Sequence, residues 1–233
     1  MQGINIFIGE PNTGKSNILE VIGLISAIGF KEEDTKNFVR FENFSNLFYD
    51  EITDENIEVK LNDSKLLVSW EKSDSIGLYT NFGKDSAYYY LKKSVSKQGE
   101  KIYWQTFGES GEIKKHLKSF KFYKFVHKDV FPEKTSEFLM PPHGSNLVSI
   151  LTHSKELREI ANNIFSKFGF KLAIRPRENK LEIQRELEEG VIIGFPYSLI
   201  SDTLQRIVFY LAAGNKSEVC KRLEKSVDSW HGG

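Results

Sequence analysis

Residues 6–26 read IFIGEPNTGKSNILEVIGLIS, and this stretch decides how the rest of the chain is interpreted. Residues 4–8, INIFI, form a short and mostly apolar run, which predicts a buried strand. After the glycine-containing turn, Ile18, Ile22 and Ile25 recur at helical spacing, which predicts an amphipathic helix over residues 15–29. A strand, a tight turn and a helix are therefore expected in direct succession.

The turn fits the pattern Gly-x-x-x-x-Gly-Lys-Ser/Thr at every fixed position. Glycines let the backbone turn so tightly that successive N–H groups converge on an anion, and the helix that follows adds its dipole. We expect the ammonium of Lys15 to reach the β- and γ-phosphates of ATP and the hydroxyl of Ser16 to ligate Mg²⁺. The predicted nucleotide-binding residues are Gly9, Glu10, Pro11, Asn12, Thr13, Gly14, Lys15, Ser16 and Asn17. The alternative for the same letters is a structural turn with a solvated lysine.

Composition excludes several other classes of protein. Lys plus Arg and Asp plus Glu number 32 each in 233 residues, so overall charge gives no argument for nucleic acid or an anionic membrane. The single cysteine, Cys220, excludes an intrachain disulfide and fits a reducing compartment. The apolar runs are shorter than a membrane span, and no signal peptide is seen. We expect a cytoplasmic protein with no membrane span.

The rest of the chain changes character twice. Residues 40–125 contain short β-branched or aromatic runs separated by turns, which predicts an antiparallel meander whose last strand is KFYKFV, 121–126. From residue 146 the pattern is helical, as two helices or one broken helix, and three strands follow. A last helix is predicted over 202–213, with a capping box from Asp202 to Gln205 and a stop at Gly214.

The continuation GKSNILEVI resembles the ABC-type ATPases of the SMC, RecF and OLD class, which the AAA-family ATP-binding proteins share. The β-rich block, PPHGSNLVSIL at 141–151 and SLISDTLQRIVFYLAA at 198–213 are similar to later parts of those proteins. The resemblance implies an α/β P-loop NTPase fold with an antiparallel β lobe and a helical segment, its sheet incomplete. It implies one ATPase-head-like domain over 1–233: P-loop strand and helix 1–38, β lobe 39–128, helical and signature-like segment 129–213 and charged tail 214–233.

In that class, a signature serine at a helix N-terminus contacts the γ-phosphate of ATP held by the opposite subunit. The resemblance places this role on Ser201, with Asp202 beside it, and implies a homodimer or a partner head. The family usually has glycine after the serine, whereas Asp202 and Thr203 follow here. The alternative is that Ser201 and Asp202 simply cap a helix.

Hydrolysis in this class uses an apolar strand that ends in an acidic pair. Residues 214–233 contain no such strand, and GVIIGF at 190–195 leads into Pro196 and Tyr197 without an acid. The catalytic residues are therefore unknown. Two hypotheses remain: an ATP-binding head that hydrolyses ATP between paired heads in an intact form, and a truncated, non-catalytic nucleotide-binding or interaction module.

A segment at 118–128 alternates lysines with aromatic residues. Such a pattern can bind single-stranded nucleic acid by stacking, but a half-buried strand with a solvated lysine face is the preferred interpretation. The five histidines follow no zinc-binding spacing, so no metal site is expected from them.

Overall fold

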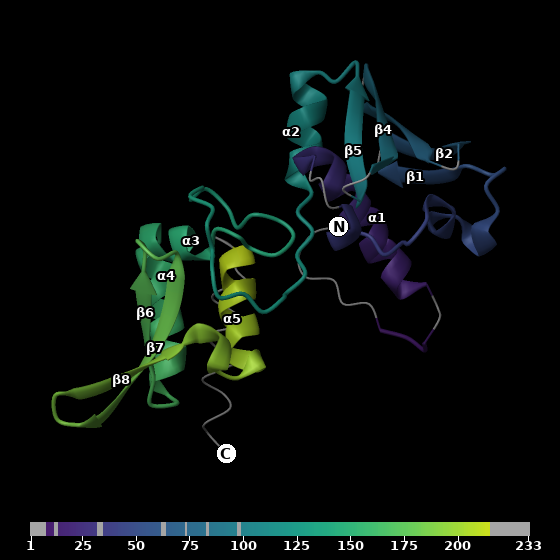
Figure 1. Cartoon of the computed structure of the whole chain (residues 1–233). Helices are drawn as coiled ribbons and strands as arrows, with labels where there is room; N and C mark the ends of the chain where they lie inside the picture. The colour runs from purple at the N-terminus through teal and green to yellow at the C-terminus, as the bar shows by residue number, and fades with distance from the viewer. Residues whose placement is uncertain are drawn as a thin grey trace. The chain divides into compact units, whose positions relative to one another are not determined.

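The computed structural model describes residues 8–11, 14–31, 35–61, 64–72, 74–82, 84–96 and 99–214 (Figure 1). The chain divides into two compact units, Met1–Phe122 and Tyr123–Gly233, and each is described by itself. Residues 4–7 of the expected strand and Cys220 fall outside the described residues, as do Asn12 and Thr13 of the loop. Ile8, the last residue of that expected strand, is described; it is 89% exposed and belongs to no strand. The sequence analysis predicts one ATPase-head-like domain over 1–233, and the division into two units does not test that prediction.

The first unit packs two helices on one antiparallel sheet. The sheet order is β1-β2-β3-β4-β5, in which each strand pairs with the next along the chain, so the predicted meander is confirmed. The elements are α1 (Lys15–Phe30), the short 3₁₀ turns η1 (Thr35–Asn37), η2 (Phe44–Leu47) and η3 (Tyr49–Glu51), β1 (Ile57–Leu61), β2 (Ser64–Lys72), β3 (Ser75–Phe82), β4 (Asp85–Ser96), β5 (Gly99–Phe107) and α2 (Gly111–Ser119).

Helix α1 confirms the predicted helix but buries only its second half. Residues 23–29 are buried, among them Ile25 and Ile28 against the sheet, whereas Ile18 and Leu19 remain 41% and 49% exposed. The apolar stripe therefore runs along the whole helix in the sequence, but in the structure its side chains are buried only beyond residue 22. The helix is anchored by its C-terminal half and presents its N-terminal half at the surface of this unit.

Two glycines let α1 approach its neighbours backbone to backbone. A Cβ added at Gly23 would lie 2.4 Å from the carbonyl oxygen of Phe38, and one at Gly29 would lie 2.8 Å from that of Leu117. No side chain fits at such distances, so glycine stands in a helix interior in spite of its low helix propensity. These contacts fix α1 against the chain that follows it and against α2.

The second unit packs three helices on a smaller antiparallel sheet of order β6-β7-β8. The predicted helical stretch is two helices, divided at Ser154, and the three predicted strands and the last helix are confirmed. The elements are α3 (Leu147–His153), α4 (Lys155–Ser166), β6 (Lys171–Arg175), β7 (Lys180–Glu188), β8 (Val191–Pro196), η4 (Tyr197–Leu199) and α5 (Asp202–Ala213). The core joins Ile160 and Phe165 of α4 to Leu181 and Ile183 of β7.

The predicted strand at 121–126 is wrong. These residues are extended but belong to no sheet, because their amides bond elsewhere. The amide of Phe122 donates to the Ser26 hydroxyl at 3.2 Å, and that of Lys124 donates to the carbonyl of Pro142 at 2.9 Å. Helix α2, at 111–119, is an element that the sequence analysis did not predict.

Asn146 organises the loop that precedes α3. Its buried amide accepts from the N–H of Met140 at 2.7 Å and donates to the carbonyls of Thr135 and Phe138 at 2.6 and 2.8 Å. One buried side chain thereby bonds three backbone groups of a segment that has no sheet or helix partner. The stretch 135–146 is held in place by this side chain.

Both described sheets are antiparallel throughout. The P-loop NTPase fold class stays a prediction, since residues 4–7 of the strand expected to lead into the loop lie outside the described residues. None of the helices in the described part of the chain combines the length and the apolar character needed to cross a membrane.

We predict that Gly23→Ala destabilises the protein by about 1–3 kcal/mol, because the added methyl group collides with the Phe38 backbone. Alanine would otherwise stabilise a helix interior by about 1 kcal/mol. Gly111→Ala is the matched control, because a Cβ there meets no atom within 4 Å. Urea unfolding should lower the midpoint for the first variant and keep or raise it for the second. A raised midpoint in both would contradict the close contact.

We predict that Asn146→Ala destabilises the protein by about 2–5 kcal/mol, because three backbone groups around a buried side chain lose their partner. Asn146→Asp keeps the acceptor for Met140 but turns a charged oxygen toward two carbonyls, so it should also be destabilising. Thermal unfolding by circular dichroism measures both. A loss below about 1 kcal/mol for the alanine variant would mean that water replaces these hydrogen bonds.

Candidate functional site

Gly14, in the loop at 9–16, is a glycine because of its backbone conformation. Gly14 has φ 78° and ψ 6°, in the left-handed region, and stands directly before the first residue of α1. A Cβ at this position would meet nothing within 4 Å, so steric crowding does not explain the glycine. The left-handed turn explains it, because other residues adopt that conformation at a cost.

The start of α1 has no side-chain cap; among the other helices in the described ranges, α3 also lacks one, whereas α2, α4 and α5 each have a serine cap. Ser110, Ser154 and Ser201 each accept a hydrogen bond from the amide three residues later, at 3.2, 3.3 and 3.4 Å, at the starts of α2, α4 and α5. Gly14 has no side-chain oxygen to offer. Helix-start amides need an acceptor from outside the helix, and the dipole favours a negative one. The start of α1 is therefore suited to an anion.

Lys15 reaches back across the loop. Its ammonium donates to the main-chain carbonyl oxygen of Glu10, five residues earlier. This bond keeps the positive charge next to the first turn of α1. The cation, the helix-start amides and the exposed Ser16 thus lie at one end of one helix, as the sequence predicted for these residues.

A magnesium ion would depend on few protein ligands here. Ser16 is exposed in the first turn of α1, so its hydroxyl can reach an ion held on a bound phosphate. Across the described ranges, no group of three or more His, Cys, Asp or Glu side chains could hold a metal ion. The residues present fit a magnesium ion that is bound through phosphate oxygens and water rather than through a protein cage.

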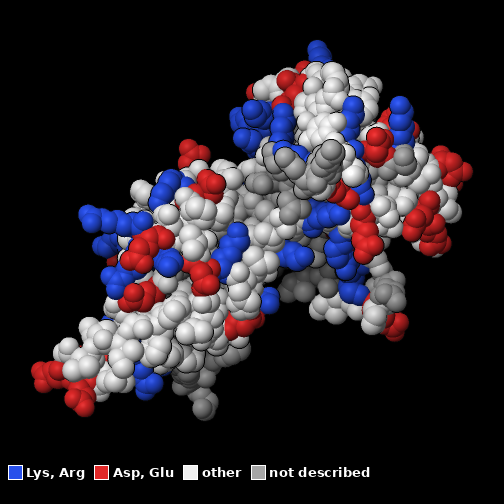
Figure 2. Space-filling view, in the orientation of Figure 1, with Lys and Arg blue, Asp and Glu red and all other residues white. Residues whose placement is uncertain are grey.

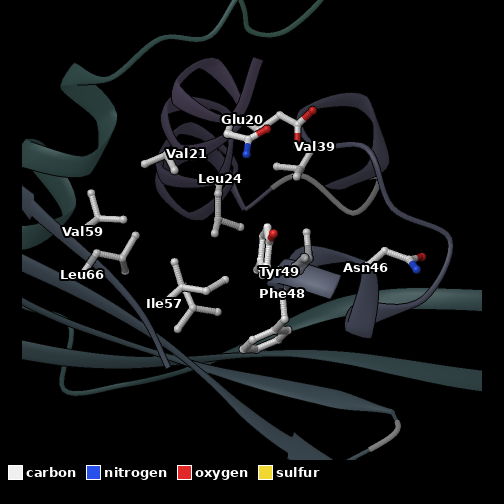
Figure 3. Close-up of a pocket in the computed structure, with 13 residues that line it drawn as sticks. Glu20, Val21, Leu24, Val39, Asn46, Phe48, Tyr49, Ile57, Val59 and Leu66 are labelled. Atoms are coloured by element: carbon white, nitrogen blue, oxygen red, sulfur yellow. The ribbon is translucent and has the colours of Figure 1, made fainter. Parts of the chain in front are cut away.

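A cavity of about 320 Å³ lies beside the first turns of α1 (Figure 3). The sequence analysis missed it, because its wall combines α1 with residues up to 68. Its lining residues are Asn17, Glu20, Val21, Leu24, Val39, Asn46, Leu47, Phe48, Tyr49, Ile57, Val59, Leu66 and Val68. The one local signal is the spacing of Asn17, Glu20, Val21 and Leu24, which places them on one face of the helix.

Ser201 and Asp202 lie in the second unit, at the start of α5. The Ser201 hydroxyl caps the helix, and Asp202 pairs with Arg206 one turn later. Asp202 Oδ1 also lies 3.1 Å from Nε2 of His127, and its hydrogen bond with Arg206 raises the pKa of that guanidinium. The carboxylate is thus held by basic side chains of its own unit. The capping interpretation is confirmed for Ser201, and its predicted contact with a partner's γ-phosphate stays a prediction.

The predicted capping box from Asp202 to Gln205 is wrong. Gln205 is buried, and its amide donates to the carbonyls of Ser198 and Ile200 at 3.3 and 2.9 Å. It therefore ties the turn before α5 to the helix. Ser201 takes the cap, because the helix begins one residue earlier than the box requires.

The apolar run considered for a hydrolytic site is β8, at the edge of the second sheet. It pairs antiparallel with β7 and continues through Pro196 into η4. On the neighbouring β7, Glu182 accepts two hydrogen bonds from Arg175, each 3.0 Å long, which lower its pKa. Among the described strands, no run of four apolar residues ends in an acidic pair.

The aromatic residues of 118–128 are used for packing. Tyr123 and Phe125 pack against the core of the second unit; the Tyr123 hydroxyl donates to Leu139 O at 2.6 Å, and Arg206 lies over the Phe125 ring. On the face that Figure 2 shows, basic and acidic side chains are interspersed rather than gathered by sign. These observations favour a half-buried packing segment over a nucleic-acid-binding surface, although the segment is not a strand.

No protein-family model matches the chain, and no curated protein or solved structure to which it was compared matches it either. The resemblance to SMC, RecF and OLD heads therefore stays a prediction carried by the chain's own motifs.

We predict that Ser201→Ala destabilises the second unit by about 1 kcal/mol, because the amide of Leu204 loses its cap. Ser201→Asn should restore most of that stability, since asparagine is an equally good capping residue. Chemical denaturation of the three proteins tests this. Equal stability of the alanine and asparagine variants would show that capping is not what Ser201 contributes.

Proposed function

We propose that this chain is an ATP-binding protein that holds Mg-ATP at Gly9–Ser16, like the ATPase heads of the SMC and OLD class. The observation that carries the proposal is the start of α1. A left-handed glycine replaces a side-chain cap there, and a lysine ammonium lies across the loop. These features support the proposal, because both would serve a bound polyphosphate.

The chemistry of binding follows from these groups. Phosphate oxygens would accept from the first-turn amides of α1 and would gain from the helix dipole. The ammonium of Lys15 would exchange the neutral carbonyl of Glu10 for a charged phosphate oxygen, and charge-assisted hydrogen bonds are the stronger kind. The loop therefore supplies both fixed and mobile donors to a polyphosphate.

Magnesium, when bound, would neutralise charge on the β- and γ-phosphate oxygens. The chain's own contribution is the Ser16 hydroxyl, placed one residue after Lys15 in the same helical turn. The described carboxylates form no cluster that would add a metal cage. This supports a role for the loop in binding and orienting the triphosphate.

In an intact form, we propose, ATP is hydrolysed between two paired heads, with the start of α5 facing the nucleotide of the partner head. The exposed Ser201 at a helix N-terminus supports this part of the proposal. The partner would be a second copy of the chain or another head of the same class.

A second candidate function is a non-catalytic nucleotide-binding or interaction module. It is favoured by β8, the apolar strand that leads into proline and a 3₁₀ turn rather than into an acidic pair. Without a carboxylate to position water, most of the transition-state stabilisation would be missing. ATP turnover by the pure protein that disappears in Lys15→Ala would reject this second function.

We predict that millimolar ATP with Mg²⁺ raises the melting temperature of the protein and that Lys15→Ala removes most of this shift. Losing the ammonium should cost about 1.5–3 kcal/mol of binding, or roughly ten- to hundredfold in affinity. Lys155→Ala is the control, because that lysine is an exposed residue of α4. No shift in the unmodified protein would contradict the proposed function.

A further inference from the structure

The cavity beside α1 begins at the same helical turn as the proposed phosphate site (Figure 3). Asn17 lines it and stands two residues after Lys15, which corresponds to about 3 Å along the helix axis. Glu20, Val21 and Leu24 continue the same face away from the loop. A ligand held at the loop by its phosphates would therefore have an open cavity directly beside it.

The wall of this cavity is apolar. It combines Leu24 of α1 with Val39, Phe48, Leu66 and Val68, all of them buried residues of the first core. Polar side chains are few among the lining residues: Asn17, Glu20, Asn46 and Tyr49. Apolar walls with a few polar groups, at volumes of about 300–1,000 Å³, are typical of small-molecule sites.

The polar lining leaves little uncompensated charge. The carboxylate of Glu20 accepts from the guanidinium of Arg40 at 2.5 and 2.6 Å. The amide of Asn46 accepts from the backbone of Glu42 and Asn43 and donates to Glu51. Because the acid is neutralised and the wall is apolar, the cavity is suited to a neutral aromatic ring rather than to an ion.

Tyr49 lies at this cavity with its ring largely in solvent. It is 83% exposed, although it stands next to the buried Phe48. The two residues after it, Asp50 and Glu51, have φ of 48° and 59°, in the left-handed region that non-glycine residues rarely adopt. The carboxylate of Glu51 holds the turn by accepting from Ser45 and Asn46, at 2.9 and 3.0 Å. A strained and pinned turn thus keeps an aromatic ring exposed beside an apolar cavity.

We infer that this cavity binds the nucleobase of the nucleotide whose phosphates bind at Gly9–Ser16. The inference rests on the proposed function and adds to it the group that distinguishes a nucleotide from a simple polyphosphate. A base is planar, neutral and aromatic, so it can stack on Tyr49 and enter the apolar wall, with the Asn17 amide near its polar edge. Loop and cavity lie along one helix, so one molecule can occupy both.

The test compares ATP with inorganic tripolyphosphate, both with Mg²⁺, by calorimetric titration. The proteins are the unmodified chain, Tyr49→Ala, Val59→Phe to fill the cavity, and Tyr103→Ala as a control on β5 outside it. ATP should bind the unmodified chain about 5- to 100-fold more tightly than tripolyphosphate, as expected for one stacked base. Tyr49→Ala and Val59→Phe should remove most of this ratio and leave tripolyphosphate binding unchanged, whereas Tyr103→Ala should change neither.

Equal affinity for the two ligands in the unmodified chain would overturn the inference while leaving the phosphate site intact. A ratio unchanged by Tyr49→Ala would overturn it as well, and this surface variant does so even if Val59→Phe fails to fold. Binding of neither ligand would remove the proposed function together with the inference. An ATP preference that only the cavity variants reduce would support it.

Discussion

The start of α1, where Gly14 provides no side-chain cap, is the feature on which the account of the site depends. A helix leaves its first amides without intrahelical acceptors, and capping by a serine, threonine or asparagine contributes about 1 kcal/mol. The chain uses serine for this purpose at α2, α4 and α5. At α1 it has a left-handed glycine and a lysine instead. A helix start with positive potential and no side-chain cap gains stability when an anion binds.

The rest of the first unit holds that helix end in position. The close contacts at Gly23 and Gly29 fix the second half of α1 against Phe38 and Leu117. The first half, with Ile18 and Leu19 exposed, lies beside the apolar cavity rather than in the core. Close packing at one end of the helix therefore gives the other end a fixed geometry, and a preorganised site is what binding a charged ligand requires.

Much of the fold could be predicted because the deciding signals are local. The extents of α1 and α5 follow from the spacing of their apolar residues, with Gly14 before α1 and Gly214 after α5. The meander follows from short β-branched or aromatic runs that are separated by turns. For residues 121–126, the sequence alone could not distinguish a strand from an extended segment outside any sheet. The difference depends on the partners of the backbone amides, which are Ser26 and Pro142, far away in the sequence. Helix α2 was missed because a nine-residue, mostly polar segment buries only Ile113 and Leu117.

The candidate site shows the same division. The loop residues were proposed from spacing alone, because the chemistry of phosphate binding fixes which residue types stand at which positions, and their role stays a prediction. The cap at α5 was misplaced by one residue, since Ser201 and Asp202 are both good capping residues and the attraction of Arg206 and His127 for Asp202 decides between them. The cavity could not be predicted, because it forms only when residues up to 68 pack against α1.

The central claim concerns main-chain amides, and amide NMR reports on them directly. Tripolyphosphate with Mg²⁺ should be titrated into ¹⁵N-labelled protein while the backbone signals are followed. The account predicts that the largest shifts occur at Gly14, Lys15, Ser16 and Asn17 and that they saturate together. Absence of shifts at these four amides, or larger shifts elsewhere in the chain, would contradict it.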